Sequence, residues 1–226
     1  GVQTCALPIF VNAHQIFALV LMHLVEHRGL RGEVVKTVST TSMIDRLAQR
    51  YGLPLTETPV GFKYVCARML EGDVLVGGEE SGGIGIRGHI PERDGILSAL
   101  VMAELMASTG LPPSGLLEEL TRRVGPHRYG RLDLHADEAS RRALVRWLSE
   151  HLPDRGAGGP VREGKRVDGF KLVLEDGSWL MVRPSGTEPL VRVYAEAPEP
   201  DSLQALLQTG RQWVDVATAG ERSHVG

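Results

Sequence analysis

The residues best suited to chemistry lie in one segment, Arg183-Pro184-Ser185-Gly186-Thr187-Glu188-Pro189. The apolar runs on either side of it, 179–182 and 190–194, are typical of strands. The connecting loop would therefore present the Arg183 guanidinium, two hydroxyl groups and the backbone N–H groups around Gly186. Arginine donates charge-assisted hydrogen bonds, and a concave backbone turn supplies further donors. This combination predicts a phosphate-binding loop.

A second loop, 78–83, has the sequence Gly-Glu-Glu-Ser-Gly-Gly and follows an apolar strand at 73–77. Ligands of α/β sheets bind at the carboxyl ends of strands, which is where this loop lies. Glu79 could accept hydrogen bonds from sugar hydroxyls, while Ser81 could both donate and accept. The competing interpretation is a glycine-rich turn with solvated acids. Glycoside hydrolysis is disfavoured, because adjacent carboxylates on one loop would not flank a scissile bond. With the phosphate loop, this segment predicts a phosphosugar ligand.

Four further side chains are candidates of lower specificity. Lys36 ends a strand at 33–37 and could meet a phosphate or a reacting oxygen, although most such lysines only cap a strand end in solvent. Lys63 stands at a tight turn into a helix. His89 and Arg93 precede a helix that Asp94 is expected to cap, and so are available to an anion.

The sequence contains no clustered carboxylates of the kind that bind magnesium and no nucleophile with a base beside it. No metal ligands are therefore expected in this chain.

The pattern in residues 10–124 alternates between strands and helices, which predicts an α/β domain with a mainly parallel mixed sheet flanked by helices. Ser42, Asp94 and Ser114 are the expected helix caps. The helices are expected at 14–27, 42–51, 62–70, 94–108 and 114–124, and the strands at 33–37, 53–58 and 73–77.

Residues 125–216 predict a smaller α+β domain with an antiparallel sheet and helices on one face. Its strands are expected at 132–135, 170–175, 179–182 and 191–195, its helices at 139–152 and 202–214, and a glycine-rich loop at 154–160. Residues 217–226 are polar and are expected to form a disordered tail. Residues 1–9 show neither a helical nor a strand period and are expected to be a non-native artefact of sequence assembly.

Composition narrows the class of protein. Of the 226 residues 42% are hydrophobic and 23% charged, which is ordinary for a globular chain, and the net charge of -3 favours neither nucleic acid nor a membrane as partner. Two cysteines make no disulfide framework, which suggests a reducing compartment and a cytoplasmic location. The apolar run 16–25 is too short to span a bilayer and is expected to be a buried helix.

Four segments in order, 58–63, 78–83, 89–95 and 183–189, resemble motifs of the α-D-phosphohexomutases, in particular the bacterial phosphoglucomutases/phosphomannomutases. The resemblance extends over residues 10–214 and corresponds to the last two of the family's four domains. Two motifs of the family are missing from the sequence. These are a serine loop of the Thr-Ala-Ser-His-Asn-Pro kind and a magnesium loop, Asp-Gly-Asp-x-Asp-Arg.

The resemblance implies a reaction that moves a phosphoryl group between the 1 and 6 positions of a hexose. It proceeds through a phosphoserine enzyme and a bisphosphosugar, which also serves as activator, and it needs Mg²⁺. The implied roles are catalysis for Lys36; contact with the sugar for Glu79 and Ser81; a position lining the same cleft for Lys63, His89 and Arg93; and phosphate binding for Arg183, Ser185, Gly186, Thr187 and Arg192.

The resulting hypothesis is a C-terminal fragment of a phosphohexomutase that acts on glucose phosphates, with mannose phosphates as a further candidate. Its partners would be a phosphosugar and the missing N-terminal domains, and the fragment alone should be inactive. The alternative is a non-catalytic phosphosugar-binding module. A nucleotide-binding domain is disfavoured, since no glycine-rich loop is followed by Lys and Ser or Thr.

Overall fold

The computed structural model describes residues 10–151, 155–156 and 159–222. Contacts divide the chain into two compact units, with the division between Gly125 and Pro126. The sequence pattern places the change of character one residue earlier, after Val124. The expected artefact at residues 1–9 lies outside the described residues.

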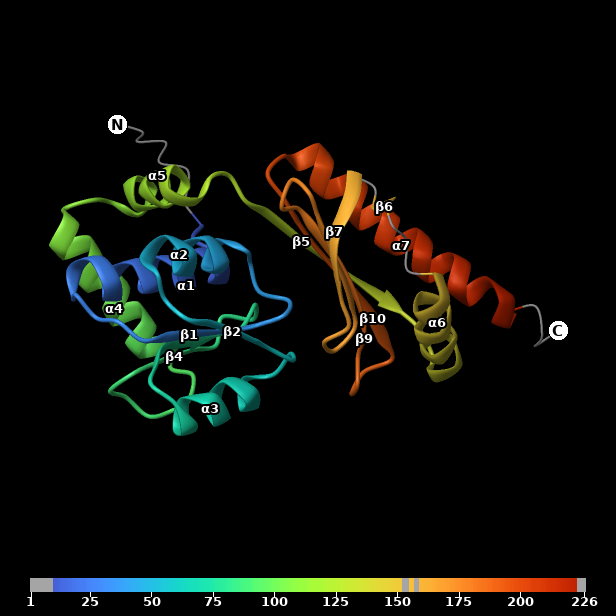
Figure 1. The fold of residues 1–226 in the computed structure, drawn as a ribbon, viewed down its shortest axis with the longest axis horizontal. Coiled ribbons are helices and arrows are strands. Elements are labelled where there is room, and N and C mark those ends of the chain that lie inside the picture. The colour runs from blue at the N-terminus through green and yellow to red at the C-terminus, as the bar shows by residue number, and fades with distance from the viewer. Residues whose placement is uncertain (1–9, 152–154, 157–158, 223–226) are drawn as a thin grey trace, which may run out of the picture. The chain divides into compact units, whose positions relative to one another are not determined.

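The first unit contains a mixed sheet, which among the described residues has the strand order β2-β1-β3-β4 (Figure 1). The parallel strands are β1 (Glu33–Thr37), β2 (Leu55–Thr58) and β3 (Val74–Gly78), and β4 (Ile84–Ile86) pairs antiparallel with β3. The predicted mainly parallel mixed sheet is confirmed. Strand β4 was not expected; it is only three residues long, too short to show a period.

Helices cover both faces of this sheet (Figure 1). A core of apolar side chains from α1, α2, α4 and α5 packs on one face, and α3 packs on the other. The run from Phe17 to Met22 is at most 4% exposed, which explains why that helix is apolar all round. The helices are α1 (Ala13–Met22), continued by a π-helical turn η1 (His23–His27), α2 (Met43–Tyr51), α3 (Phe62–Glu71), α4 (Gly95–Thr109) and α5 (Pro113–Val124).

The second unit is an antiparallel sheet with the strand order β5-β10-β9-β8-β7-β6 among the described residues. Helices α6 and α7 cover one face (Figure 1). This confirms the predicted α+β domain. The elements are β5 (Arg128–His135), α6 (Glu138–His151), β6 (Arg155–Gly156), β7 (Gly159–Lys165), β8 (Phe170–Leu174), β9 (Trp179–Pro184), β10 (Leu190–Ala197) and α7 (Pro200–Arg222).

Two local predictions for this unit are wrong. The described part of the expected loop at 154–160 forms a hairpin, in which β6 pairs with the start of β7. The chain is not disordered from residue 217, because α7 continues to Arg222. Ala217 packs against the core of the unit, and the buried Thr218 hydroxyl donates to the carbonyl of Val214 at 2.8 Å. The buried face of α7 thus continues past residue 217, although the sequence there is mostly polar.

One of the three expected helix caps is confirmed. Asp94 Oδ1 accepts from the backbone N–H groups at the start of α4, at 2.8 and 2.9 Å. Ser42 makes no capping bond, and the N–H of Met43 donates instead to the Thr41 hydroxyl at 3.1 Å. Ser114 lies inside α5, which begins at Pro113, where the fixed φ of proline suits a first helical position.

No single helix in the described ranges is long and apolar enough to cross a membrane. The pair α4 and α5, bent by 86°, would meet that test by length and composition together.

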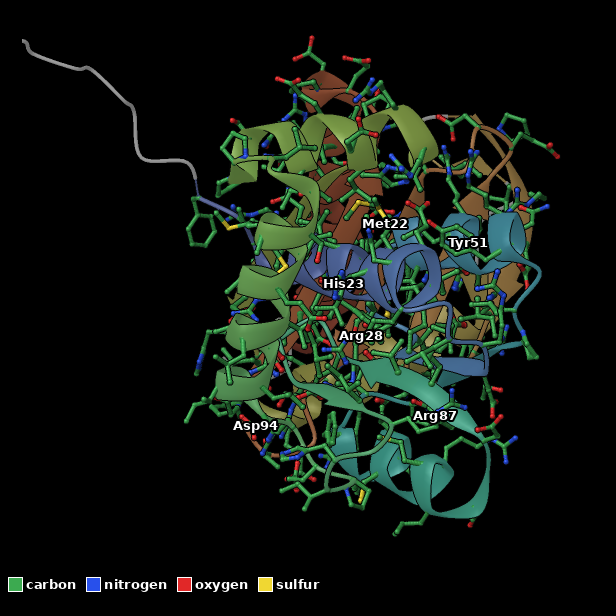
Figure 2. All side chains as sticks on the ribbon, turned by 90° about the vertical axis from the view of Figure 1, so that its left-hand side faces the viewer. Met22, His23, Arg28, Tyr51, Arg87 and Asp94 are labelled. Atoms are coloured by element: carbon green, nitrogen blue, oxygen red, sulfur yellow. The ribbon has the colours of Figure 1, made fainter. Side chains whose placement is uncertain are left out.

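The end of α1 is tied to α4 by a small charged cluster (Figure 2). Arg28 Nε donates to Glu104 Oε1 at 3.0 Å, and the buried His23 lies with its Nε2 3.3 Å from the same oxygen. The hydrogen bond from Arg28 lowers the pKa of Glu104 to about 2. Burial lowers the pKa of His23, because desolvation disfavours the charged imidazole.

These shifts predict that the first unit loses stability on acidification. A carboxyl whose folded pKa lies near 2 contributes stability that is present above its ordinary value of 4.5 and is lost as the pH falls toward 2. His23 acts in the same direction, since its protonation below 6.5 is disfavoured in the folded state. We expect Glu104→Gln to lose less stability than the wild type between about pH 5 and pH 3, measured by urea unfolding and far-UV circular dichroism. Glu118→Gln, at an exposed position of α5, is the control and should retain the wild-type slope.

Helix α7 approaches the second sheet closely at two glycines. A Cβ added at Gly210 would lie 2.4 Å from Val193 Cγ1, and one at Gly130 would lie 2.8 Å from Leu207 Cδ1. The distance between helix and sheet therefore depends on the absence of these side chains.

We expect Gly210→Ala to lower the unfolding free energy of the second unit by about 1–3 kcal/mol, the usual cost of overpacking a well-filled core. The three tryptophans, Trp147, Trp179 and Trp213, all belong to this unit, so urea unfolding followed by tryptophan fluorescence reports on it alone. Gln208→Ala on the exposed side of α7 is the control. Equal stability of the two variants would contradict the packing argument.

Candidate functional site

The loop at 78–83 folds into a tight turn at the carboxyl end of β3. The N–H of Glu79 donates to the carbonyl of Gly83 at 3.0 Å, and the N–H of Gly82 donates to the carbonyl of Glu79 at 3.1 Å. Gly82 has a φ of 95°, which favours glycine. The sequence therefore places its glycines where this turn needs them.

This turn brings together three of the predicted sugar-binding residues. The Glu79 carboxylate is 7% exposed, and its Oε1 accepts from Ser81 Oγ at 2.7 Å and lies 3.3 Å from Arg93 Nη1. The Arg93 side chain is 61% exposed and also lies over the ring of Phe62. Carboxylate, hydroxyl and guanidinium groups thus form one cluster that can both accept and donate hydrogen bonds.

His89 is held at the start of α4, close to this cluster in sequence. Its Nε2 lies 2.9 Å from Asp94 Oδ2 (Figure 2 labels Asp94 at the helix start). The pKa of Asp94 is lowered, chiefly by the N–H of Leu97 and then by the His89 imidazole. Asp94 therefore orients His89 in addition to capping the helix.

Glu80 points to a different partner from its neighbour Glu79. Its Oε2 accepts from Ser39 Oγ at 2.6 Å and from Thr37 Oγ1 at 3.2 Å. Both hydroxyls are buried in the turn that follows β1. Sequence reasoning did not assign a role to Glu80, although the hydroxyl-rich run 37–41 signalled a need for an acceptor. Glu80 ties the sugar loop to the β1 turn.

Lys36 lies at that β1 turn but is engaged within it. The side chain is 2% exposed, and its Nζ pairs with Asp45 and donates to the carbonyl of Thr41 at 3.3 Å. Glu57 Oε2, on the neighbouring strand, lies 3.8 Å away. Lys63 is exposed on the first turn of α3, with its Nζ 4.9 Å from the centre of the Tyr64 ring. The structure therefore does not place either lysine among the Glu79 contacts, and their roles remain predictions.

The phosphate loop of the second unit connects β9 and β10 and is organised around Ser185. This residue is 3% exposed, and its Oγ accepts from the N–H of Thr187 at 3.4 Å and of Glu188 at 3.2 Å. Its own N–H donates to the carbonyl of Leu190 at 2.8 Å. Ser185 shapes the turn, while Gly186 and Thr187 are exposed at its tip.

Strand pairing sets two arginines directly opposite each other below this tip. In the antiparallel register of β9 and β10, Arg183 is the partner of Arg192. Arg183 Nε donates to Asp168 Oδ2 at 2.9 Å, and Arg192 pairs with Glu188. Asp168 adopts a positive φ of 54°, which is uncommon for a residue other than glycine. The Arg183 guanidinium therefore contacts Asp168 through its Nε.

Arg141 of α6 contacts the same loop and was missed in the sequence. Its Nη1 donates to the carbonyl of Ser185 at 2.5 Å and to that of Glu188 at 3.1 Å. No sequence motif marks this arginine, which lies 44 residues before Ser185. An open cavity of about 490 Å³ lies between the start of α6 and the loop, lined by Glu138, Arg141, Arg142, Val145, Pro184 and Gly186.

Comparison with known families follows the same division of the chain. The model for "Phosphoglucomutase/phosphomannomutase, alpha/beta/alpha domain III" matches residues 12–124, and that for "Phosphoglucomutase/phosphomannomutase, C-terminal domain" matches residues 138–209. The chain belongs to the phosphoglucomutase/phosphomannomutase family.

Several relatives of the chain carry names of this kind. It is 30% identical over 211 residues to a phosphoglucomutase/phosphomannomutase of Thermococcus kodakarensis, covering 93% of this chain and 44% of the relative. It is 33% identical to a phosphoglucomutase of Komagataeibacter xylinus, over 89% of this chain and 39% of the relative. A phosphoglucosamine mutase of Novosphingobium aromaticivorans is 33% identical, over 87% of this chain and 40% of the relative.

A solved structure of a related protein has the same fold as the chain. The putative phosphomannomutase from Thermus thermophilus superimposes with a TM-score of 0.75 at 36% identity, covering 92% of this chain and 41% of that one. The chain therefore spans less than half the length of these relatives.

The magnesium ion implied by the family has no evident ligands here. Within the described ranges, no three His, Cys, Asp or Glu side chains gather in a way that could hold a metal ion. The residues present do not fit the ion, so no step of the reaction is assigned to it here.

The Glu80 contacts generate a prediction about coupling between the two loops. Glu80→Ala removes the carboxylate that accepts from two buried hydroxyls, and hydrogen bonds to charged groups contribute about 1.5–3 kcal/mol. We expect amide hydrogen exchange to accelerate at both 37–41 and 78–83, because one side chain joins the two segments. Glu118→Ala at an exposed position should change neither segment. Faster exchange at 78–83 alone would contradict the coupling.

Proposed function

We propose that the chain is the sugar- and phosphate-binding half of a phosphohexomutase that interconverts hexose 1-phosphate and hexose 6-phosphate. The observation that carries the proposal is the opposed pair Arg183 and Arg192 beneath a loop organised by Ser185. Two guanidinium groups on facing positions repel each other, so a dianion bound between them gains from both. A phosphate monoester is such an anion.

The first unit would supply the contacts to the sugar. The cluster of Glu79, Ser81 and Arg93 offers both acceptors and donors to sugar hydroxyls, and His89 is held by Asp94 a few residues further along the chain. The relatives include phosphoglucomutases, phosphomannomutases and phosphoglucosamine mutases, which supports a hexose phosphate as the substrate class. Glucose, with mannose as a further candidate, remains our proposed sugar.

The reacting half of the enzyme would come from the remainder of a longer protein. The serine and magnesium motifs of the family are absent from this sequence, and the matched relatives are more than twice as long as the aligned region. We therefore propose that the phosphoserine, the bound Mg²⁺ and the bisphosphosugar activator belong with domains that precede this chain, in the cytoplasm. The 226-residue chain alone should bind phosphosugar without turning it over.

An apolar groove of about 600 Å³ in the first unit supports that arrangement. It lies along α1 and α4, its lining is apolar except for Ser98, and Phe10 within it is 85% exposed. Contiguous exposed apolar surface usually marks an interaction site. We propose that the preceding domain of the intact protein packs on this groove.

The alternative function, a non-catalytic phosphosugar-binding module, uses the same contacts. The two proposals differ in whether the encoded protein continues upstream into the serine and magnesium motifs. Sequencing the genomic DNA before the Phe10 codon separates them, since a start codon there would favour the binding module.

We expect Arg183→Met to weaken binding of glucose 6-phosphate to the chain by about 10- to 100-fold, measured by isothermal titration calorimetry. The reason is the loss of charge-assisted hydrogen bonds, which contribute about 1.5–3 kcal/mol each. Arg146→Met, at an exposed position of α6, removes the same charge elsewhere and should retain wild-type affinity. Tryptophan fluorescence checks that both variants are folded.

A second variant tests the sugar contacts independently. Glu79→Gln should weaken binding of glucose 6-phosphate while leaving the affinity for inorganic phosphate at the wild-type value. If the wild-type chain binds neither ligand, the proposed function is wrong.

A further inference from the structure

The side chain of Arg141 spans the phosphate loop from the side of α6. One nitrogen, Nη1, donates to the carbonyls of Ser185 and Glu188 at 2.5 and 3.1 Å. These two carbonyls flank the exposed tip, Gly186 and Thr187. A single guanidinium group therefore fixes both ends of the tip.

The backbone that carries Arg141 is held in place by several contacts. Helix α6 begins against the end of the loop, where the N–H of Ala136 donates to the carbonyl of Pro189 at 2.9 Å. Asp137 Oδ1 accepts from the N–H of Ser140 at 2.8 Å, and this bond lowers the pKa of Asp137. Leu144 and Leu148 are fully buried in the core of the unit. The position of Arg141 is thus set by the fold rather than by the loop.

Peptide geometry converts this contact into an orientation of donors. The described peptide bonds are all trans, so the C=O of Ser185 and the N–H of Gly186 point in opposite directions from the same plane. With the carbonyl turned toward Arg141, the Gly186 N–H must point away from α6. The carbonyl of Glu188 is likewise drawn toward the guanidinium, which removes a second negative dipole from the tip.

We propose that Arg141 is a positioning residue for phosphate binding, which holds the Ser185 and Glu188 carbonyls back and so aims the Gly186 N–H at the bound anion. The identity of the anion rests on the proposed function, whereas the effect on the loop does not.

The neighbouring arginine provides a matched control. Arg142 lies beside the same cavity but pairs with Glu138, and among the described residues no contact joins it to the loop carbonyls. Arg142→Met therefore removes the same charge one residue away without touching the loop.

The experiment compares Arg141→Met, Arg141→Lys and Arg142→Met with the wild-type chain by two measurements. The first is amide hydrogen exchange of residues 185–190 without ligand. The second is the Kd for inorganic phosphate, determined from the change in the amide chemical shift of Gly186 during titration. We expect Arg141→Met to speed exchange about tenfold and to raise Kd about tenfold, a change equivalent to about 1.4 kcal/mol. Arg141→Lys should lie between, since lysine keeps the charge but its nitrogen ends one bond closer to the backbone than Nη1 does, and Arg142→Met should match the wild type.

Three outcomes decide between the proposals. Wild-type exchange and Kd in Arg141→Met would overturn the positioning role. Equal losses of affinity in Arg141→Met and Arg142→Met would also overturn it, since net charge would then account for the effect. If Arg141→Met alters exchange but the wild type binds no phosphate, the effect of Arg141 on the loop stands, while its role in phosphate binding and the proposed function both fail. Should Arg141→Met not fold, Arg141→Lys carries the same test.

Discussion

The antiparallel register of β9 and β10 is the constraint on which the proposed phosphate site depends. It sets Arg183 directly opposite Arg192, and like charges at facing positions of a sheet destabilise it. The structure offsets this repulsion with carboxylates, since Asp168 binds one guanidinium and Glu188 the other. An anion between the two arginines would offset it further.

The loop above these arginines is held by contacts that do not involve a ligand. Ser185 accepts from two backbone N–H groups inside the turn, and Arg141 donates to two carbonyls outside it. Such prior organisation reduces the entropy that must be lost when a ligand binds. It also means that a hydroxyl expected to contact the ligand serves first to form the binding surface.

The loop at 78–83 in the first unit is also held by contacts that do not involve a ligand. It follows a buried strand, and its two adjacent glutamates contact different groups. Glu79 faces Ser81 and Arg93, while Glu80 bonds to the hydroxyls of the β1 turn. Lys36 braces that turn from its other side through Asp45 and backbone carbonyls. The loops from β1 and β3 therefore form one connected polar network at the carboxyl ends of these two strands.

The sequence by itself determined the fold class of both units, because helical and strand periods reflect burial that each segment carries locally. It also predicted a phosphate loop and a sugar loop, since glycines, hydroxyls and charges in one short segment are visible without a structure. The tertiary structure alone decided that α7 continues to Arg222, that Lys36 is buried in an ion pair and that Glu80 and Arg141 brace the two loops. These features depend on partners 9 to 47 residues away, and the register or packing that brings such residues together leaves no local pattern in the chain.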